Sequence, residues 1–174
     1  MRPFNREAPE LNEENLIFYS HIGLITVRFA ELESILTHII ERLINSDDSI
    51  ISNSLIEKNN LAANLDLLKK INRRRQYQEE KIDEIISKTN KSRNVRNFFV
   101  HGVWSDVKKD FGELYIYCSN HKHIYEKVSD GQQWTRYRSD KFTLNDFQDE
   151  IKKIDEILLI LKELWEDLHE LDSF

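Results

Sequence analysis

The chain has 174 residues, which suits one domain that is large enough to bury a core without disulfides or metals. Its two prolines and four glycines are few, which favours long helices over a turn-rich β architecture. A formal net charge of −6 argues against a general nucleic-acid coat protein, although a local basic patch remains compatible with RNA binding.

Compartment signals point to the cytoplasm. Residues 1–9 contain no apolar run typical of a signal peptide, and no stretch approaches the roughly 18 apolar residues of a membrane span. A single cysteine, Cys118, excludes an internal disulfide and favours a reducing compartment. We therefore expect a cytoplasmic protein that does not bind a membrane.

The first half of the chain has a helical apolar period. A helix is predicted over residues 12–44, where apolar side chains recur at alternating steps of four and three. These side chains are Ile25, Phe29, Leu32, Leu36, Ile39 and Leu43. Further helices are predicted over 52–72 and 76–101. The apolar face of the last one is interrupted by Thr89 and Ser92. Gly102 stands where a residue in the left-handed conformation commonly ends a helix.

After Gly102 the period changes to that of strands. Residues 114–118 and 123–128 are rich in Tyr, Ile and Val, and a turn-like run over 119–122 separates them. Asp130-Gly131 is a tight-turn signal ahead of residues 134–138. We predict an inserted antiparallel β-hairpin or three-stranded meander over about residues 112–139.

The closing helix has the clearest pattern. Thr143 and Asp146 stand in a capping-box-like relation at its start. Apolar residues then follow at heptad spacing, namely Leu144, Phe147, Ile151, Ile154, Leu158, Leu161, Trp165 and Leu168. Such a seam packs either against the first helix or against a second copy in a dimer. The predicted fold is mainly α, an up-and-down bundle of four to five helices in a single domain over residues 1–174.

The candidate active site lies at the end of the helix over 76–101 and comprises Arg96, Asn97 and His101. Asn97 and His101 are four residues apart and share a helix face, with Arg93 one turn earlier. A helix C-terminus favours a protonated imidazole, which can serve as general acid or base. Arg96 offers a charged fork for a phosphate oxygen, and Asn97 can orient either partner.

These groups suit cleavage of RNA by its own 2′-hydroxyl, which needs a proton acceptor, a proton donor and a stabiliser of charge on phosphorus. The reaction needs no metal, and the sequence shows no convincing carboxylate cluster to hold one. A symmetric dimer would supply two histidines. A structural interpretation stays open, because this spacing also arises by chance and a His before a terminal Gly is an ordinary helix cap.

Together these features resemble the HEPN superfamily, helical bundles whose motif is Arg, usually a polar residue next, and His after four to six intervening residues. Residues 96–101 fit with four intervening residues and the favoured Asn. The run Phe29-Ala30-Glu31-Leu32-Glu33 and the aromatic Trp104 after the motif also resemble bacterial members. The resemblance covers residues 16–104 and the closing helix.

The resemblance implies a metal-independent endoribonuclease that acts in a toxin or antiphage-defence setting as a homodimer whose two motifs meet. Arg96 and His101 would be catalytic, Asn97 would assist, and Glu33 would orient Arg96. Arg93 and Trp104 are candidate RNA-binding residues. The implied partners are an RNA substrate, a second copy, and an antitoxin or regulatory protein, with neither metal nor cofactor.

Several alternatives remain. Some HEPN proteins are non-catalytic, so the chain could instead be a protein-interaction or nucleotide-binding regulatory module. Cys118, His121 and His123 are close enough in sequence to suggest metal ligands, but no fourth ligand is evident. The aromatic residues of the β segment suit either base stacking or cross-strand packing. Basic runs within 69–75 and 88–96 suit either phosphate contacts or solvated helix faces.

Overall fold

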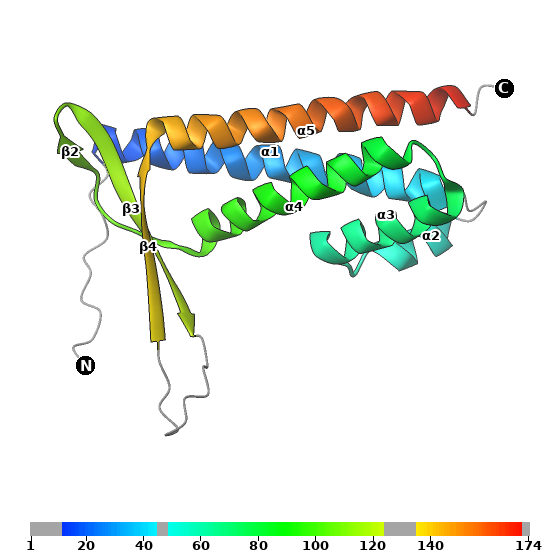
Figure 1. Cartoon of the computed structure of the whole chain (residues 1–174), viewed down its shortest axis with the longest axis horizontal. Coiled ribbons are helices and arrows are strands. Elements are labelled where there is room, and N and C mark those ends of the chain that lie inside the picture. Colours follow the sequence, from blue (N-terminus) through cyan, green and yellow to red (C-terminus); the bar gives the residue numbers. More distant parts are fainter. Residues whose placement is uncertain (1–11, 45–48, 124–134, 172–174) are drawn as a thin grey trace, which may run out of the picture.

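The computed structural model describes residues 12–44, 49–123 and 135–171. Over these residues the chain is mainly helical with one small antiparallel sheet, which confirms the predicted fold class (Figure 1). The described helices are α1 (Glu13–Ile44), α2 (Ser49–Ile56), α3 (Leu61–Arg75), α4 (Glu79–His101) and α5 (Leu144–Leu171). No helix among the described residues is long and apolar enough to cross a membrane.

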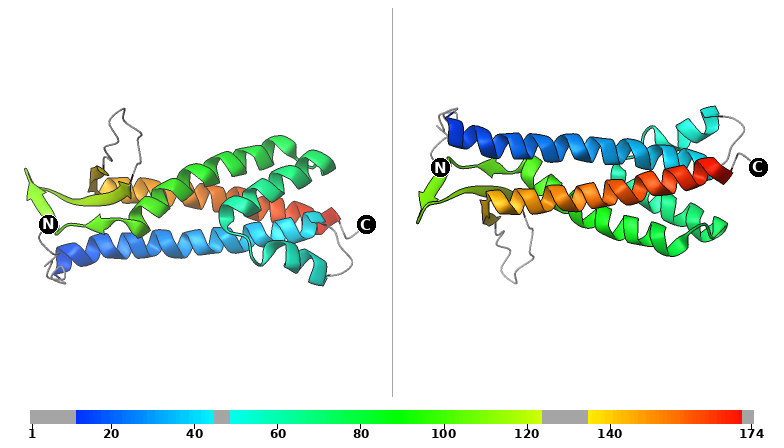
Figure 2. Two further views of the ribbon diagram at one scale, coloured as in Figure 1. Left: turned by 90° about the horizontal axis from the view of Figure 1, so that it is seen from below. Right: turned by 90° about the horizontal axis from the view of Figure 1, so that it is seen from above.

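The two longest helices, α1 and α5, form the spine of the bundle. They lie side by side and run in the same direction, while α4 packs on both and runs in the opposite direction (Figures 1 and 2). The heptad seam of α5 is buried at Phe147, Ile154 and Leu161, each with no exposed surface. The predicted packing of the seam against the first helix is therefore confirmed, and the seam is not available as a dimer interface.

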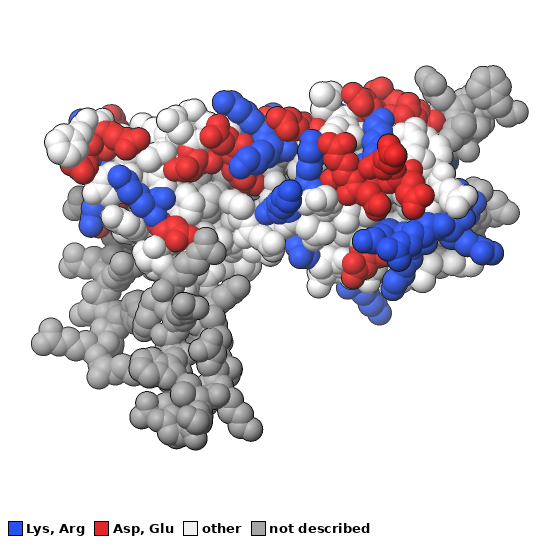
Figure 3. All heavy atoms as spheres, in the orientation of Figure 1, with Lys and Arg blue, Asp and Glu red and all other residues white. Residues whose placement is uncertain are grey.

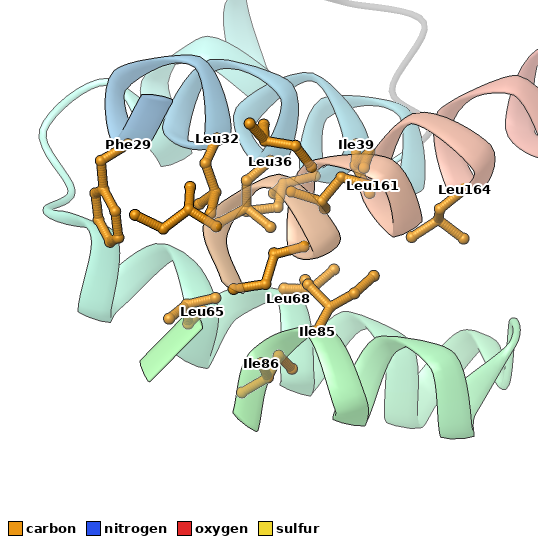
Figure 4. Packing of buried hydrophobic residues seen from close by; sticks show 14 of the residues in the cluster. Phe29, Leu32, Leu36, Ile39, Leu65, Leu68, Ile85, Ile86, Leu161 and Leu164 are labelled. Carbon is orange, nitrogen blue, oxygen red and sulfur yellow. The ribbon is translucent and has the colours of Figure 1, made fainter. Parts of the chain in front are cut away.

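The core lies where α1, α3, α4 and α5 meet. Phe29, Leu32 and Leu36 of α1 face Leu68 of α3 and Leu161 of α5 (Figure 4). These side chains are at most 1% exposed, so burial of their apolar surface is a main source of stability. The stripe predicted along the first helix is the stripe that the structure buries.

The single helix predicted over 52–72 is wrong, because α2 ends at Ile56 and α3 begins at Leu61. Asn60 has an extended backbone, and its side-chain oxygen accepts a hydrogen bond from the Ala63 N–H at 3.0 Å. This N-cap starts a new helix after the polar run over residues 57–60. The next helix begins at Glu79 rather than residue 76, because Gln76, with φ of 55°, ends α3.

The sheet consists of β1 (Val103–Trp104), β2 (Lys108–Asp110), β3 (Glu113–His123) and β4 (Thr135–Thr143). The central strand is β3, which pairs antiparallel with β4 on one side and with β1 and β2 on the other. The predicted turn over residues 119–122 is wrong, because β3 continues through it in register with β4. The described strands begin at residue 103 and end at residue 143, beyond both ends of the predicted 112–139. Residues 124–134, with most of the predicted strand over 123–128 and Asp130-Gly131, lie outside the described residues.

Two local signals explain how the sheet joins its neighbours. The β2–β3 turn consists of Phe111 and Gly112, both with positive φ (47° and 87°), as a two-residue hairpin requires. At the start of α5, the Thr143 N–H and hydroxyl donate to the Asp146 carboxylate at 2.7 and 2.8 Å. The predicted cap is therefore confirmed, with the aspartate as acceptor of both bonds.

Candidate active site

The last turn of α4 is anchored by a cluster of aromatic rings. Phe99 is 2% exposed, and its ring centroid lies 4.9 Å from that of Phe147, 5.1 Å from Phe142 and 5.5 Å from Trp104. The Trp104 indole N–H also donates to the Phe99 carbonyl at 2.9 Å. These contacts join α4, β1, β4 and α5, so the motif helix ends on a firmly packed base.

Gly102 follows the helix for a steric reason. Its φ of −78° and ψ of 154° are extended, so the predicted left-handed conformation is wrong. A Cβ at this position would lie 2.7 Å from the Phe98 carbonyl oxygen and would overlap the Cys118 sulfur. Cys118 itself donates its S–H to the same carbonyl at 3.6 Å. Glycine thus allows β3 to approach the end of α4 closely.

Cys118 is a structural thiol rather than a reactive one. It is fully buried, and burial raises the pKa of the thiol to about 12, with the nearby Asp140 carboxylate adding to the shift. A thiol with so high a pKa is neither a good nucleophile nor a good metal ligand near neutral pH. Among the residues that the structure describes, no group of three or more His, Cys, Asp or Glu side chains could hold a metal ion.

Arg96 is held in place by two contacts. One of its terminal nitrogens, Nη1, donates to Asn97 Oδ1 at 3.1 Å, and its guanidinium carbon lies 5.8 Å from the centroid of the Phe29 ring. The second contact is a cation–π interaction at the outer limit of its range. The Nε atom is buried and has no hydrogen-bond partner in the described chain. The other terminal nitrogen, Nη2, makes no hydrogen bond in the described chain, so the guanidinium keeps a donor for an anion while its direction is restrained.

The other motif residues lie along the last two turns of α4. The helix is continuous to His101, so Asn97 and His101 share a face, as the spacing predicted. The His101 side chain is exposed, whereas Arg93 and Asn97 are half-buried. Arg93 resembles Arg96 in having a buried Nε without a hydrogen-bond partner in the described residues. Two guanidinium groups and one exposed imidazole thus lie within the last three turns of a single helix.

Two predicted site residues have different surroundings. No hydrogen bond or ion pair joins Glu33 to Arg96, both of which lie in the described chain; Glu33 instead lines a pocket between α1, α2 and α3. Trp104 is half-buried in the aromatic cluster and uses its N–H on Phe99. Packing accounts for Trp104, and the side chain that restrains Arg96 across the bundle is Phe29, not Glu33.

Charge is unevenly distributed over the surface. Figure 3 shows basic side chains gathered over the end of α3, where Arg73, Arg74 and Arg75 form the last turn. An acidic group lies close by, over the start of α4, which carries Glu79 and Glu80. The exposed arginines at this end of the bundle thus face nearby carboxylates, which reduces their attraction for an extended polyanion.

Comparison of the chain with protein-family models, curated proteins and solved structures finds no match.

Proposed function

We propose that the chain is a metal-independent endoribonuclease of HEPN type that acts as a homodimer in a cytoplasmic toxin or antiphage-defence system. The observation that carries the proposal is the state of Arg96. Its guanidinium is directed by Asn97 and Phe29, keeps Nη2 without a hydrogen bond in the described chain, and precedes His101 on the same helix end. Guanidinium groups bind phosphate oxygens through charged N–H donors, and an unbonded Nη2 can serve in this way.

The chemistry follows from these groups. A base removes the proton from the 2′-hydroxyl of RNA, the 2′-oxygen attacks the adjacent phosphorus, and the 5′-oxygen leaves with a proton from an acid. The products are a 2′,3′-cyclic phosphate and a 5′-hydroxyl. His101 supplies the proton transfer, and Arg96 stabilises the charge that develops on the phosphate oxygens. Arg93 binds a neighbouring phosphate on the same helix.

A second copy of the chain would complete the site by supplying a second His101, so that one imidazole acts as base and the other as acid. Exposed apolar side chains next to the motif support such an arrangement. Val100 and Val103 flank His101 and are 40% and 37% exposed. Apolar surface around a polar site is typical of interfaces that bring two chains together.

The test is cleavage of RNA in EDTA by the purified chain. We expect the wild type to leave 2′,3′-cyclic phosphate ends, and His101→Ala and Arg96→Ala to lower the rate by at least 10²-fold. His38→Gln is a matched control, because His38 is an exposed imidazole on α1 outside the motif. Light scattering reports whether each variant keeps the oligomeric state of the wild type.

Equal cleavage by the wild type and His101→Ala, with both folded and of one oligomeric state, would contradict a catalytic role for His101. Absence of cleavage across structured and single-stranded RNAs, with and without extracts that carry an activating signal, would contradict the nuclease itself.

A second candidate function is a non-catalytic module that binds another protein. It is favoured by the outer face of α2, where Ile51 and Leu55 lie one turn apart and are 53% and 51% exposed. Apolar pairs at this spacing are typical helix-in-groove anchors. On this view Leu55→Ser abolishes assembly with a partner such as an antitoxin, whereas His101→Ala leaves assembly unchanged. The opposite pattern would favour a function centred on the motif.

A further inference from the structure

A pocket of about 500 Å³ opens between α1, α2 and α3, apart from the motif residues. Its lining consists of eight residues, namely Glu33, Thr37, Glu41, Ile56, Glu57, Asn59, Leu61 and Asn64. A volume of this size holds a small organic molecule. The question is which chemistry the lining would accept.

Every ionisable side chain in the lining is a carboxylate. Glu33 and Glu41 stand eight residues apart on α1, which places them about 12 Å apart along the helix axis. Glu57 contributes a third carboxylate just after α2 ends. The described structure pairs Glu41 with the exposed His38 at 3.0 Å, and shows no ion pair for Glu33 or Glu57. The pocket is therefore strongly acidic and largely unneutralised by the chain.

A second observation, independent of these charges, points to a missing donor. Asn64 is only 7% exposed, and its side-chain oxygen is buried without a hydrogen-bond partner in the described chain. A buried acceptor in this state destabilises the fold unless water or a bound group donates to it. Asn59 also lines the pocket, and its amide nitrogen donates to the Leu55 carbonyl at 2.8 Å.

The polar lining thus offers acceptors and negative charge, whereas Ile56 and Leu61 add apolar surface between them. A metal ion does not suit this lining, since no group of three or more metal-ligating side chains lies close enough together in the described residues. A ligand that fits needs several N–H donors, more than one positive charge, and methylene segments that separate them.

We propose that this pocket binds a linear organic polycation, a small molecule with two or more protonated amines joined by methylene chains. One ammonium group binds at Glu33 and another towards Glu41, with Glu57 in reach of either. An N–H donates to the Asn64 side-chain oxygen, and the methylenes pack on Ile56 and Leu61. This site is separate from the proposed nuclease chemistry and does not depend on it.

The test is isothermal titration calorimetry of the full chain with spermidine at low ionic strength and without RNA. We expect saturable binding of one molecule per chain. The double variant Glu33→Gln/Glu57→Gln keeps the side-chain shapes but removes two charges, and it should bind at least tenfold more weakly. The matched control is Glu113→Gln/Glu156→Gln, which removes two exposed carboxylates elsewhere on the surface and should leave the affinity within twofold.

Asn64→Leu separates a binding role from a structural one. It replaces the unsatisfied amide with a side chain of similar volume, so the free protein should be at least as stable, while spermidine binding weakens and its thermal shift shrinks. If Asn64→Leu does not fold, the glutamine variants still test whether the pocket binds spermidine.

Three results would overturn the proposal. The first is the absence of saturable binding, and the second is equal binding by the wild type and the double glutamine variant. The third is capture of an arginine-containing or lysine-containing peptide without any binding of spermidine, which would assign the pocket to a protein partner. Butylamine, with a single charge, should bind at least tenfold more weakly than spermidine, and equal affinities would contradict a requirement for two charges.

Discussion

Gly102→Ala tests whether the end of the motif helix depends on a close approach or on backbone freedom. The native φ of −78° is open to alanine, so the substitution strains no dihedral angle. The added Cβ would nevertheless lie 2.7 Å from the Phe98 carbonyl oxygen and would overlap the Cys118 sulfur. The Phe98 oxygen is a backbone atom and the Cys118 sulfur belongs to a fully buried side chain, so the backbone around the helix end must shift.

Overpacking of this kind costs about 1–3 kcal/mol, and we expect Gly102→Ala to lower the free energy of unfolding by that amount. Gly23→Ala is the matched control, because nothing lies within 4 Å of the added Cβ on α1. Alanine inside a helix is favoured over glycine, so the control should gain roughly 0.5–1 kcal/mol. The two glycine substitutions should therefore have opposite signs in urea unfolding followed by circular dichroism.

A double-mutant cycle identifies the clash. Cys118→Ala removes the sulfur, so Gly102→Ala should cost about 1 kcal/mol less in that background than in the wild type. The remaining cost reflects the Phe98 carbonyl oxygen, which no side-chain change removes. Additive effects of the two substitutions, or a stabilising Gly102→Ala, would refute the steric explanation. Gly102 would then have no role beyond ending the helix.

Three further predictions concern single groups. Trp104→Phe keeps a ring in the aromatic cluster but leaves the Phe99 carbonyl without its indole donor, so the free energy of unfolding measured in urea should fall by about 1 kcal/mol. The buried Cys118 thiol should resist iodoacetamide at about pH 8 until the chain unfolds. Because burial raises the pKa of this thiol from 9.0 to about 12, its contribution to stability is complete below pH 9 and is lost as the pH rises towards 12. Thermal unfolding measured across that pH range would reveal the loss. The hydrogen bond from Gln78 lowers the pKa of Asp167 below its ordinary 3.8. The contribution of this carboxylate to stability is therefore present above pH 3.8 and is lost as the pH falls through the lower pKa of the folded state. Asp167→Asn should flatten this part of the acid-unfolding profile.

The long helices could be predicted because one physical requirement acts along their whole length. Every third or fourth residue of α1 and α5 enters the same core, so the periodicity repeats many times and single exceptions do not hide it. The break between α2 and α3 falls in residues 57–60, which are all polar and which one solvated turn of a longer helix could equally carry, and Asn60 caps the new helix. Periodicity alone cannot reveal such a break.

The continuity of β3 was missed for a related reason. Ser119, Asn120 and Lys122 are residues that favour turns when considered alone, yet each pairs with a residue of β4 and extends the ladder. Cross-strand pairing supplies hydrogen bonds that outweigh a weak local preference, and a single strand's sequence does not show its partner. The short β1 and β2 strands follow the same rule, since both are defined by pairing with β3.

In the candidate site, too, the features set by local helix geometry were predictable, and those set by packing between helices were not. The common face of Asn97 and His101 follows from helix geometry and was predictable from the spacing. The platform under Arg96 was not, because Phe29 belongs to α1 and stands there only once α1 and α4 have packed. The expected contact of Glu33 with Arg96 is absent for the same reason, because the packing of the helices decides which side chains of α1 reach α4. Glu33 lies one turn beyond Phe29 and lines the pocket between α1, α2 and α3 instead.

The inserted sheet has a direct structural connection to the motif. Trp104 of β1 and Phe142 of β4 pack on the Phe99 ring, and Cys118 of β3 bonds to the Phe98 carbonyl. Each described strand that touches the end of α4 therefore restrains the residues between Asn97 and His101. Catalytic groups need restraint of this kind, because small displacements cost large factors in rate. The sheet is thus expected to serve the motif as a buttress, and loosening Gly102, Cys118 or Trp104 should impair any activity of His101 without touching its imidazole.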